Sequence, residues 1–507
     1  MKIEDYRRDF AAYNSALELA YYQHRAGFER ELRIEPVYDR YGDLFTRDAI
    51  DDLERELAET PEHRETERAS LHALMGAARY GYLQAQAKDL TFERALCESS
   101  ARIEWKGESL PAYNAPAKIA NEAVPAERRE LTARWLDALS ACNDLRAARL
   151  ESFHESARAL GFSSYRQLCT ETSGTNYEQL ADTTERFLKR TERPYMSALA
   201  RAAASDMQGV AFDDLQHADY FFFERMARLD TLFPAGESLP TYGEAMKGLG
   251  IRVEQQKNIM IDDEARPFKN PRAACLRVNP PDDVRLLLSP IGGAYDYRTL
   301  FHEAGHAQHL GWSSRELAAR YPEFIYAPDY ATTEAYAFLF QHLFLDRLWL
   351  REYRSDLSAE QMGEAVRALA LRTTYTVRRF CVKLKYEIAL HDAPQVRSQN
   401  LAATYSTLQA EATGFHRDQA LYLMDVDDEF YVAAYLRAWA FEAGLREHLL
   451  TRHGRRWWAT RKAGDELIDL WNTSSRYTVE ELAQLIGFGE ISFELLADTL
   501  IAAMSEE

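Results

Sequence analysis

Apolar residues recur every three to four positions over long parts of the chain, which places them on one face of an α-helix. The clearest stretches are residues 11–24, 131–160, 177–204 and 366–390. Proline and glycine are sparse and lie mostly between these stretches. The pattern predicts a mostly α-helical protein without a repeat, a low-complexity tract or a long linker.

Two short apolar runs interrupt the helical pattern near the middle of the chain. Residues 273–278 and 284–289 are of strand type, and residues 279–283, with the sequence NPPDD, are typical of a turn. We therefore expect a β-hairpin directly before the next helix. This hairpin is either purely structural or offers an edge strand that could hold an extended peptide by main-chain hydrogen bonds.

The helix after the hairpin carries the sequence His302-Glu303-Ala304-Gly305-His306. Two histidines four positions apart share one helix face, so both imidazoles can bind one cation. The glutamate between them can then contact a water on that cation. This H-E-x-x-H pattern is typical of zinc metallohydrolases, in which the glutamate is the general base. Because three fixed positions also coincide by chance, the flanking residues must support the interpretation.

The flanking residues fit a helix in a buried site. Asp296 stands where an N-cap is expected. Gly305 is unusual inside a helix, where glycine costs about 1 kcal/mol relative to alanine, so we expect another backbone or a substrate to approach it closely. His309 lies on the same face as His302, and we interpret it as a core or supporting histidine rather than a ligand.

A catalytic zinc site needs a third protein ligand. Glu334 is the only acid between Tyr330 and Leu345, and it lies in the first turn of a predicted helix that is otherwise apolar. A buried carboxylate is unfavourable unless it binds a cation, although an acid at a solvated helix start would also be stable. We predict that His302, His306 and Glu334 bind one zinc ion.

Three stretches, residues 266–275, 292–297 and 302–309, resemble the thimet oligopeptidase and oligoendopeptidase F family. That family carries H-E-x-G-H-x-x-H and a glutamate ligand further along the chain, where this sequence has Glu334. The resemblance is clearest over residues 221–310 and near the C-terminus, and it is weak over the first 150 residues. It implies an almost entirely helical fold with two lobes around a deep central channel and a small β-sheet beside the H-E-x-x-H helix.

The resemblance also implies that tyrosines of a C-terminal helix stabilise the tetrahedral intermediate. In the matching segment, residues 427–439, Tyr435 fits the family's first catalytic tyrosine better than Tyr431 does. A phenol that donates to the oxyanion would contribute about 3 kcal/mol. The family's second tyrosine is replaced by Ala438, and acids stand where the family has an upstream histidine. Packing is the alternative role for both tyrosines, because the chain has 28 of them.

Composition limits the partners and the location. The net charge of −19 argues against nucleic acid, whose binding needs clustered positive charge. No apolar run reaches the length of a membrane span, and the first residues contain no apolar signal core. Five cysteines without C-x-x-C pairing are typical of reduced thiols, so we expect a cytoplasmic protein. The basic run at residues 452–462 is expected to be a solvated helix face packed by Trp457 and Trp458, and the alternative is a grip for a peptide carboxylate.

We expect an N-terminal helical region over residues 1–195 and a catalytic region over residues 196–507, with the small sheet at about 250–290. The function that these residues favour is zinc-dependent hydrolysis of peptide bonds in short peptides, with a zinc-bound water activated by Glu303. The alternatives are a related helical zinc carboxypeptidase, a non-peptide amide hydrolase and a non-catalytic peptide-binding relative. The pattern predicts neither the oligomeric state nor the choice between internal and terminal cleavage.

Overall fold

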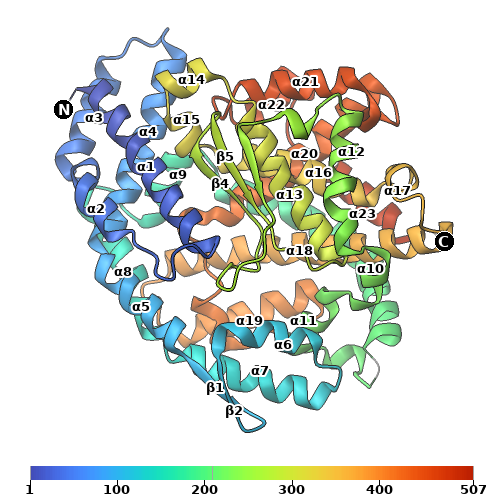
Figure 1. The fold of residues 1–507 in the computed structure, drawn as a ribbon. Helices are drawn as coiled ribbons and strands as arrows, with labels where there is room; N and C mark the ends of the chain where they lie inside the picture. Colours follow the sequence, from blue (N-terminus) through green and yellow to red (C-terminus); the bar gives the residue numbers. More distant parts are fainter. Residues whose placement is uncertain (1, 208, 506–507) are drawn as a thin grey trace. The chain divides into compact units, whose positions relative to one another are not determined.

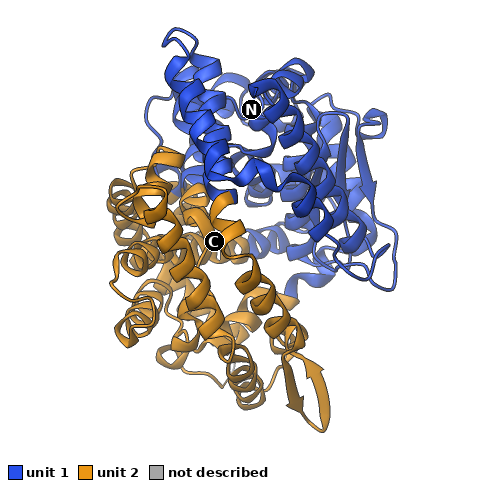
Figure 2. Ribbon diagram, turned by 90° about the vertical axis from the view of Figure 1, so that its left-hand side faces the viewer, with its two compact units in different colours: residues 1–81, 228–366, 437–496 blue, residues 82–227, 367–436, 497–507 orange. Residues whose placement is uncertain are grey.

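The computed structural model describes residues 2–207 and 209–505, which are mostly α-helical (Figure 1). The chain forms two compact units, each assembled from three separate stretches of sequence (Figure 2). Unit 1 comprises residues 1–81, 228–366 and 437–496, and unit 2 comprises residues 82–227, 367–436 and 497–507. These units differ from the predicted division at residue 195, which falls inside one continuous helix, Tyr177–Asp206.

Unit 1 contains α1 (Ile3–Arg25), α2 (Glu35–Tyr41), α3 (Arg47–Glu59), α12 (Ser238–Gly248), β3 (Ile259–Asp262), β4 (Ala274–Asn279), β5 (Asp283–Leu287), α13 (Ala294–Gly311), α14 (Arg315–Arg320), α15 (Glu323–Tyr326), α16 (Tyr330–Gln341), α17 (Arg347–Tyr353), α21 (Arg461–Asn472) and α22 (Val479–Leu485). Unit 2 contains α5 (Lys88–Ser100), β1 (Arg102–Trp105), β2 (Glu108–Pro111), α6 (Ala115–Asn121), α7 (Pro125–Ser140), α8 (Asn143–Ala159), α9 (Tyr165–Ser173), α10 (Tyr177–Asp206), α11 (His217–Arg225) and α19 (Gln399–Thr413). The helices that continue from one unit into the other are α4 (Glu65–Gln86), α18 (Ala359–Asp392), α20 (Tyr431–His453) and α23 (Glu494–Ser505). All of the predicted metal ligands therefore belong to unit 1.

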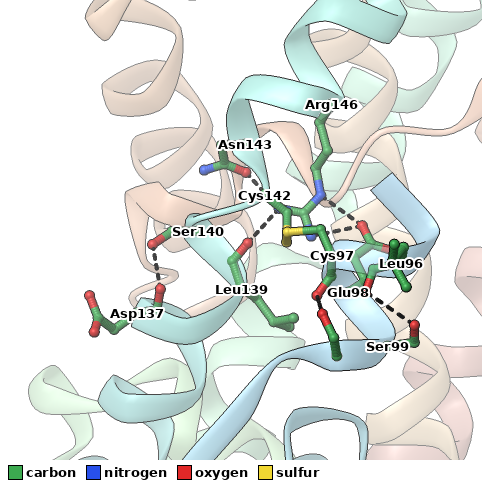
Figure 3. The surroundings of a disulfide bond; sticks show 11 residues. Leu96, Cys97, Glu98, Ser99, Asp137, Leu139, Ser140, Cys142, Asn143 and Arg146 are labelled. Atoms are coloured by element: carbon green, nitrogen blue, oxygen red, sulfur yellow. Dashed lines mark hydrogen bonds and ion pairs between the residues drawn. A yellow bond between two sulfur atoms is a disulfide. The ribbon is translucent and has the colours of Figure 1, made fainter. Parts of the chain in front are cut away.

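The four stretches of helical periodicity are confirmed as helical, three of them within the single helices α1, α10 and α18. The stretch over residues 131–160 is divided into α7 and α8, because the chain turns at Ala141 and Cys142. The turn brings the buried Cys142 against Cys97 of α5, and the two form a disulfide (Figure 3).

The disulfide joins Cys97 of α5 to the turn that precedes α8, and the two Cα atoms are 6.0 Å apart. Beside it, an Arg146 nitrogen lies 2.8 Å from a Glu98 oxygen (Figure 3). The expectation that all cysteines are reduced is therefore wrong for Cys97 and Cys142. Local sequence could not reveal the pair, because its members are 45 positions apart and meet only when α5 packs on α8. The remaining cysteines, Cys169, Cys275 and Cys381, are free thiols.

The predicted hairpin is confirmed with small shifts at its ends, as β4 and β5 (Figure 1). The strand order of this sheet is β3-β5-β4, with β3 parallel and β4 antiparallel to β5. Every second side chain of β4 is buried, in a cluster with Tyr22 and Ala26 of α1. Cys275 and Arg277 therefore lie on the opposite face of the strand. The N-terminal helix thus supports the strand that precedes the predicted metal helix.

The basic run at residues 452–462 lies at the surface, where most of its cationic side chains are exposed. Trp457 and Trp458 are buried beneath it, which confirms the predicted packing role of the tryptophans. The run spans the end of α20, a 3₁₀ turn and the start of α21 rather than a single helix face. Among the described residues, no helix combines the length and the apolar character of a membrane span.

Candidate metal centre

Helix α13 carries the H-E-x-x-H residues and begins after two glycines. Gly292 and Gly293 have φ angles of 87° and 92°, a conformation that side chains disfavour. Gly293 is the N-cap. The prediction that Asp296 is the N-cap is therefore wrong: it lies inside the first turn, and its carboxylate accepts the N–H groups of Ile291 and Gly292 at 3.0 and 3.1 Å. The acid thus fixes the loop that leads into the helix.

The glycine of the motif allows α13 to touch α16. A Cβ atom built on Gly305 would lie 2.6 Å from Ala337 Cα and 2.8 Å from Tyr336 O, both backbone atoms of α16. Real Cβ atoms essentially never make such short contacts. The predicted close approach is confirmed, and the partner is the backbone of the helix that carries Glu334.

Helix α16 brings Glu334 to the two histidines. The helix is apolar and buried along most of its length, and Glu334 is 4% exposed. Glu334 Oε2 lies 3.3 Å from His302 Nε2 and 3.8 Å from His306 Nε2. Within the described residues, these three side chains form the only group of three or more metal-ligating side chains with donor atoms close enough for one ion.

The geometry fits a zinc ion. Tetrahedral ligands at about 2.0–2.2 Å from zinc lie roughly 3.3–3.6 Å from one another, close to the observed separations. His306 Nδ1 lies 2.8 Å from Thr333 Oγ1, which orients the ring so that Nε2 faces the carboxylate of Glu334. His302 Nδ1 is buried without a hydrogen-bond partner among the described residues. Two imidazole nitrogens and one carboxylate oxygen are the donor set of many catalytic zinc sites.

Burial governs the protonation of the site. Burial lowers the pKa of His306 to about 3, so its imidazole is neutral and can donate a lone pair. Burial also lowers the pKa of His302, but the hydrogen bond and the charge of Glu334 outweigh it and raise that pKa. Burial raises the pKa of Glu303, and the nearby charge of Glu334 acts in the same direction, against the opposing effect of His302.

Glu303 is held by the hairpin. Its Oε2 accepts the backbone N–H of Cys275 in β4 at 2.8 Å. The hydrogen bond fixes the carboxylate beside the histidines of its own helix and leaves Oε1 for another partner. The strand therefore contributes to the site by positioning the predicted base.

His309 is a supporting residue, as predicted. It is 1% exposed, its Nε2 lies 3.1 Å from the Ser474 carbonyl oxygen, and its ring packs against Tyr336. Burial lowers its pKa to about 4. The residue links α13 to the segment after α21 and is outside the metal-ligating group.

Tyr431 and Tyr435 lie in the first turns of α20, within unit 2. Both are half-buried, and their ring centroids are 5.0 Å apart, so they share one helix face. Tyr435 also packs edge-on against Phe380 of α18. Their role in catalysis stays a prediction.

The structure adds two supporting groups that the sequence did not predict. They are the Thr333 hydroxyl, which binds His306, and the Cys275 N–H, which binds Glu303. Thr333 directly precedes Glu334, and this adjacency was the available signal. A backbone N–H carries no residue-specific signal, so the second group could be found only from the packing of β4 on α13.

Comparisons with known proteins give a match in fold but not in sequence. No protein-family model and no curated protein sequence matches the chain. A crystal structure of a protein assigned as an oligoendopeptidase F from Bacillus anthracis str. Ames is similar with a TM-score of 0.65 and 15% identity, over 97% of this chain and 88% of that chain. The structure of PZ peptidase A with inhibitor 2 is similar with a TM-score of 0.64 and 14% identity, over 98% and 90%. The fold suggested by the family resemblance, mostly α with a small β-sheet, is thereby confirmed.

Proposed function

We propose that this protein is a zinc-dependent peptidase that hydrolyses peptide bonds in short peptides. The observation that carries the proposal is the convergence of His302, His306 and Glu334 beside Glu303. The fold neighbours are named as peptidases, which supports peptide substrates over other amides.

The mechanism assigns a separate task to each group. A zinc ion held by the three ligands would supply a Lewis acid that polarises the scissile carbonyl and acidifies water. Glu303 Oε2 is occupied by the Cys275 N–H, so Oε1 is the atom that takes the proton of the attacking water. The same oxygen then gives the proton to the leaving amine.

Tyr435 is proposed to donate its phenolic proton to the developing oxyanion, with Tyr431 as the weaker candidate. The support is the family resemblance of residues 427–439 together with the half-exposed position of both rings. A cytoplasmic location is a further proposal. The Cys97–Cys142 disulfide argues against it, because disulfides are more typical of oxidising compartments, and cell fractionation decides between the two.

The test is a digest of a mixed library of short peptides by the zinc-loaded protein, read by mass spectrometry. Glu303→Gln is the matched control, because it keeps the metal ligands and removes the base. Internal cuts made by the wild type alone support an oligopeptidase. Trimming from one end favours the carboxypeptidase alternative. If the wild type binds zinc and cleaves nothing, the peptidase proposal is wrong, and amide hydrolysis or peptide binding takes its place.

A further inference from the structure

A buried arginine joins α20 to the start of the ligand helix α16. Arg437 is 6% exposed. Its Nη1 and Nη2 donate to the two oxygens of Asp329 at 3.0 and 2.8 Å. Its Nε and Nη2 also donate to Glu480 at 2.8 and 2.6 Å. The planar guanidinium therefore holds two carboxylates in a fixed geometry.

Asp329 is the N-cap of α16. Its Oδ1 accepts the N–H of Ala331 at 3.1 Å and also receives the bond from Arg437. The next polar residue in this turn, Thr332, donates its hydroxyl to the Tyr477 carbonyl oxygen at 3.1 Å. The first turn of α16 is thus tied to the segment at residues 477–480 at two points, one of them through the guanidinium.

This turn leads directly into the proposed metal site. Thr333, its last residue, binds His306, and the proposed ligand Glu334 follows at the start of the second turn. The contact at Gly305 fixes the middle of α16 against α13, but the ends of a helix can still tilt about such a contact. Because metal sites tolerate ligand shifts of only about 0.2 Å, the start of the helix needs a second anchor.

We infer that Arg437 is a positioning residue for the metal ligand Glu334, acting through Asp329 and the first turn of α16. The inference rests on the proposed zinc function. Arg437 touches neither the metal nor the substrate in this role. It sets the direction of the helix start, and thereby the distance between Glu334 and the two histidines.

The experiment compares Arg437→Gln with a matched control, Arg128→Gln. Arg128 is another buried arginine, in unit 2, that pairs with Asp219. Zinc affinity is measured by competition with a chromogenic chelator, the visible spectrum is recorded after cobalt substitution, and thermal unfolding is followed without metal. We expect Arg437→Gln to bind zinc about 10- to 100-fold more weakly and to shift the cobalt bands. Arg437→Lys should recover part of the affinity, and Arg128→Gln should lose only thermal stability.

Equal zinc affinity and equal cobalt spectra in Arg437→Gln and the wild type would overturn the inference. If Arg437→Gln does not fold, Asp329→Asn replaces it, because asparagine still caps the helix but loses the ion pair. Weaker zinc binding in Asp329→Asn supports the inference, and unchanged binding overturns it. A wild type that binds no zinc overturns the proposed function and this inference together, whereas a failure of the inference alone leaves zinc bound in every variant.

Discussion

Replacing Gly305 by alanine tests the contact on which the metal centre is built. Intrinsic helix propensity favours the change by about 1 kcal/mol, since alanine is the better residue inside a helix. Sterics oppose it, because the new Cβ would lie 2.6 Å from Ala337 Cα, and backbone atoms cannot rotate away. Overpacking of this kind typically costs about 1–3 kcal/mol. We therefore expect a net loss of stability.

The same substitution should move the three proposed ligands apart. Ordinary contact begins at 3.4 Å, so α13 and α16 have to separate by the difference from 2.6 Å, which is 0.8 Å. The histidines and Glu334 lie on opposite sides of this contact, and they would move apart by a comparable amount. Because a metal site tolerates about 0.2 Å, zinc affinity should fall far more than the loss of stability alone would suggest.

The assay is a chelator competition for zinc, together with thermal unfolding with and without metal. Gly311→Ala is the matched control in the same helix. Its Cβ would meet the end of the Ile259 side chain at 2.6 Å, which can change rotamer. We expect the control to keep the wild-type zinc affinity. If Gly305→Ala binds zinc as tightly as the wild type and unfolds at a higher temperature, the close approach does not determine the site.

Three further predictions follow from individual contacts. Thr333→Val removes the hydrogen bond to His306 at nearly constant volume, and we expect about 10- to 100-fold weaker zinc binding by the same competition. Tyr435→Phe should lower kcat about 100-fold with unchanged zinc content, and normal kinetics would assign the tyrosine to packing. Replacing Cys97 and Cys142 by serine opens a loop of 45 residues and should lower the free energy of unfolding by up to about 4 kcal/mol, measured by denaturant unfolding. The wild type is unfolded with and without a reducing agent, and identical midpoints in these two conditions would contradict this disulfide.

The convergence of His302, His306 and Glu334 could be predicted because each of the two helices carries its own local pattern. Two histidines four apart on a helix, and one acid at the start of an otherwise apolar helix, are patterns that backbone geometry turns directly into shared faces and burial. The hairpin and the close approach at Gly305 were predictable for the same reason. Each depends on residues within one turn or one strand pair.

The supporting contacts could not be predicted, because each joins distant segments. Arg437 is 108 positions from Asp329, and Cys142 is 45 positions from Cys97. Apolar periodicity says which face of a helix is buried but not which partner buries it. The two compact units could not be predicted for the same reason, because each contains three stretches of the chain that only tertiary packing brings together.

The contact between α13 and α16 departs from what stability alone would favour. A glycine in mid-helix costs about 1 kcal/mol relative to alanine, and a carboxylate that is 4% exposed adds a desolvation cost. A helix pair with only a structural role could lie at an ordinary distance, where alanine at position 305 and an apolar residue at position 334 would be the more stable choice. Both departures fall on the two helices whose close approach brings Glu334 to the histidines. Sequence rules are broken where a bound cation would offset the cost of the buried carboxylate, which is why these positions point to a candidate metal site.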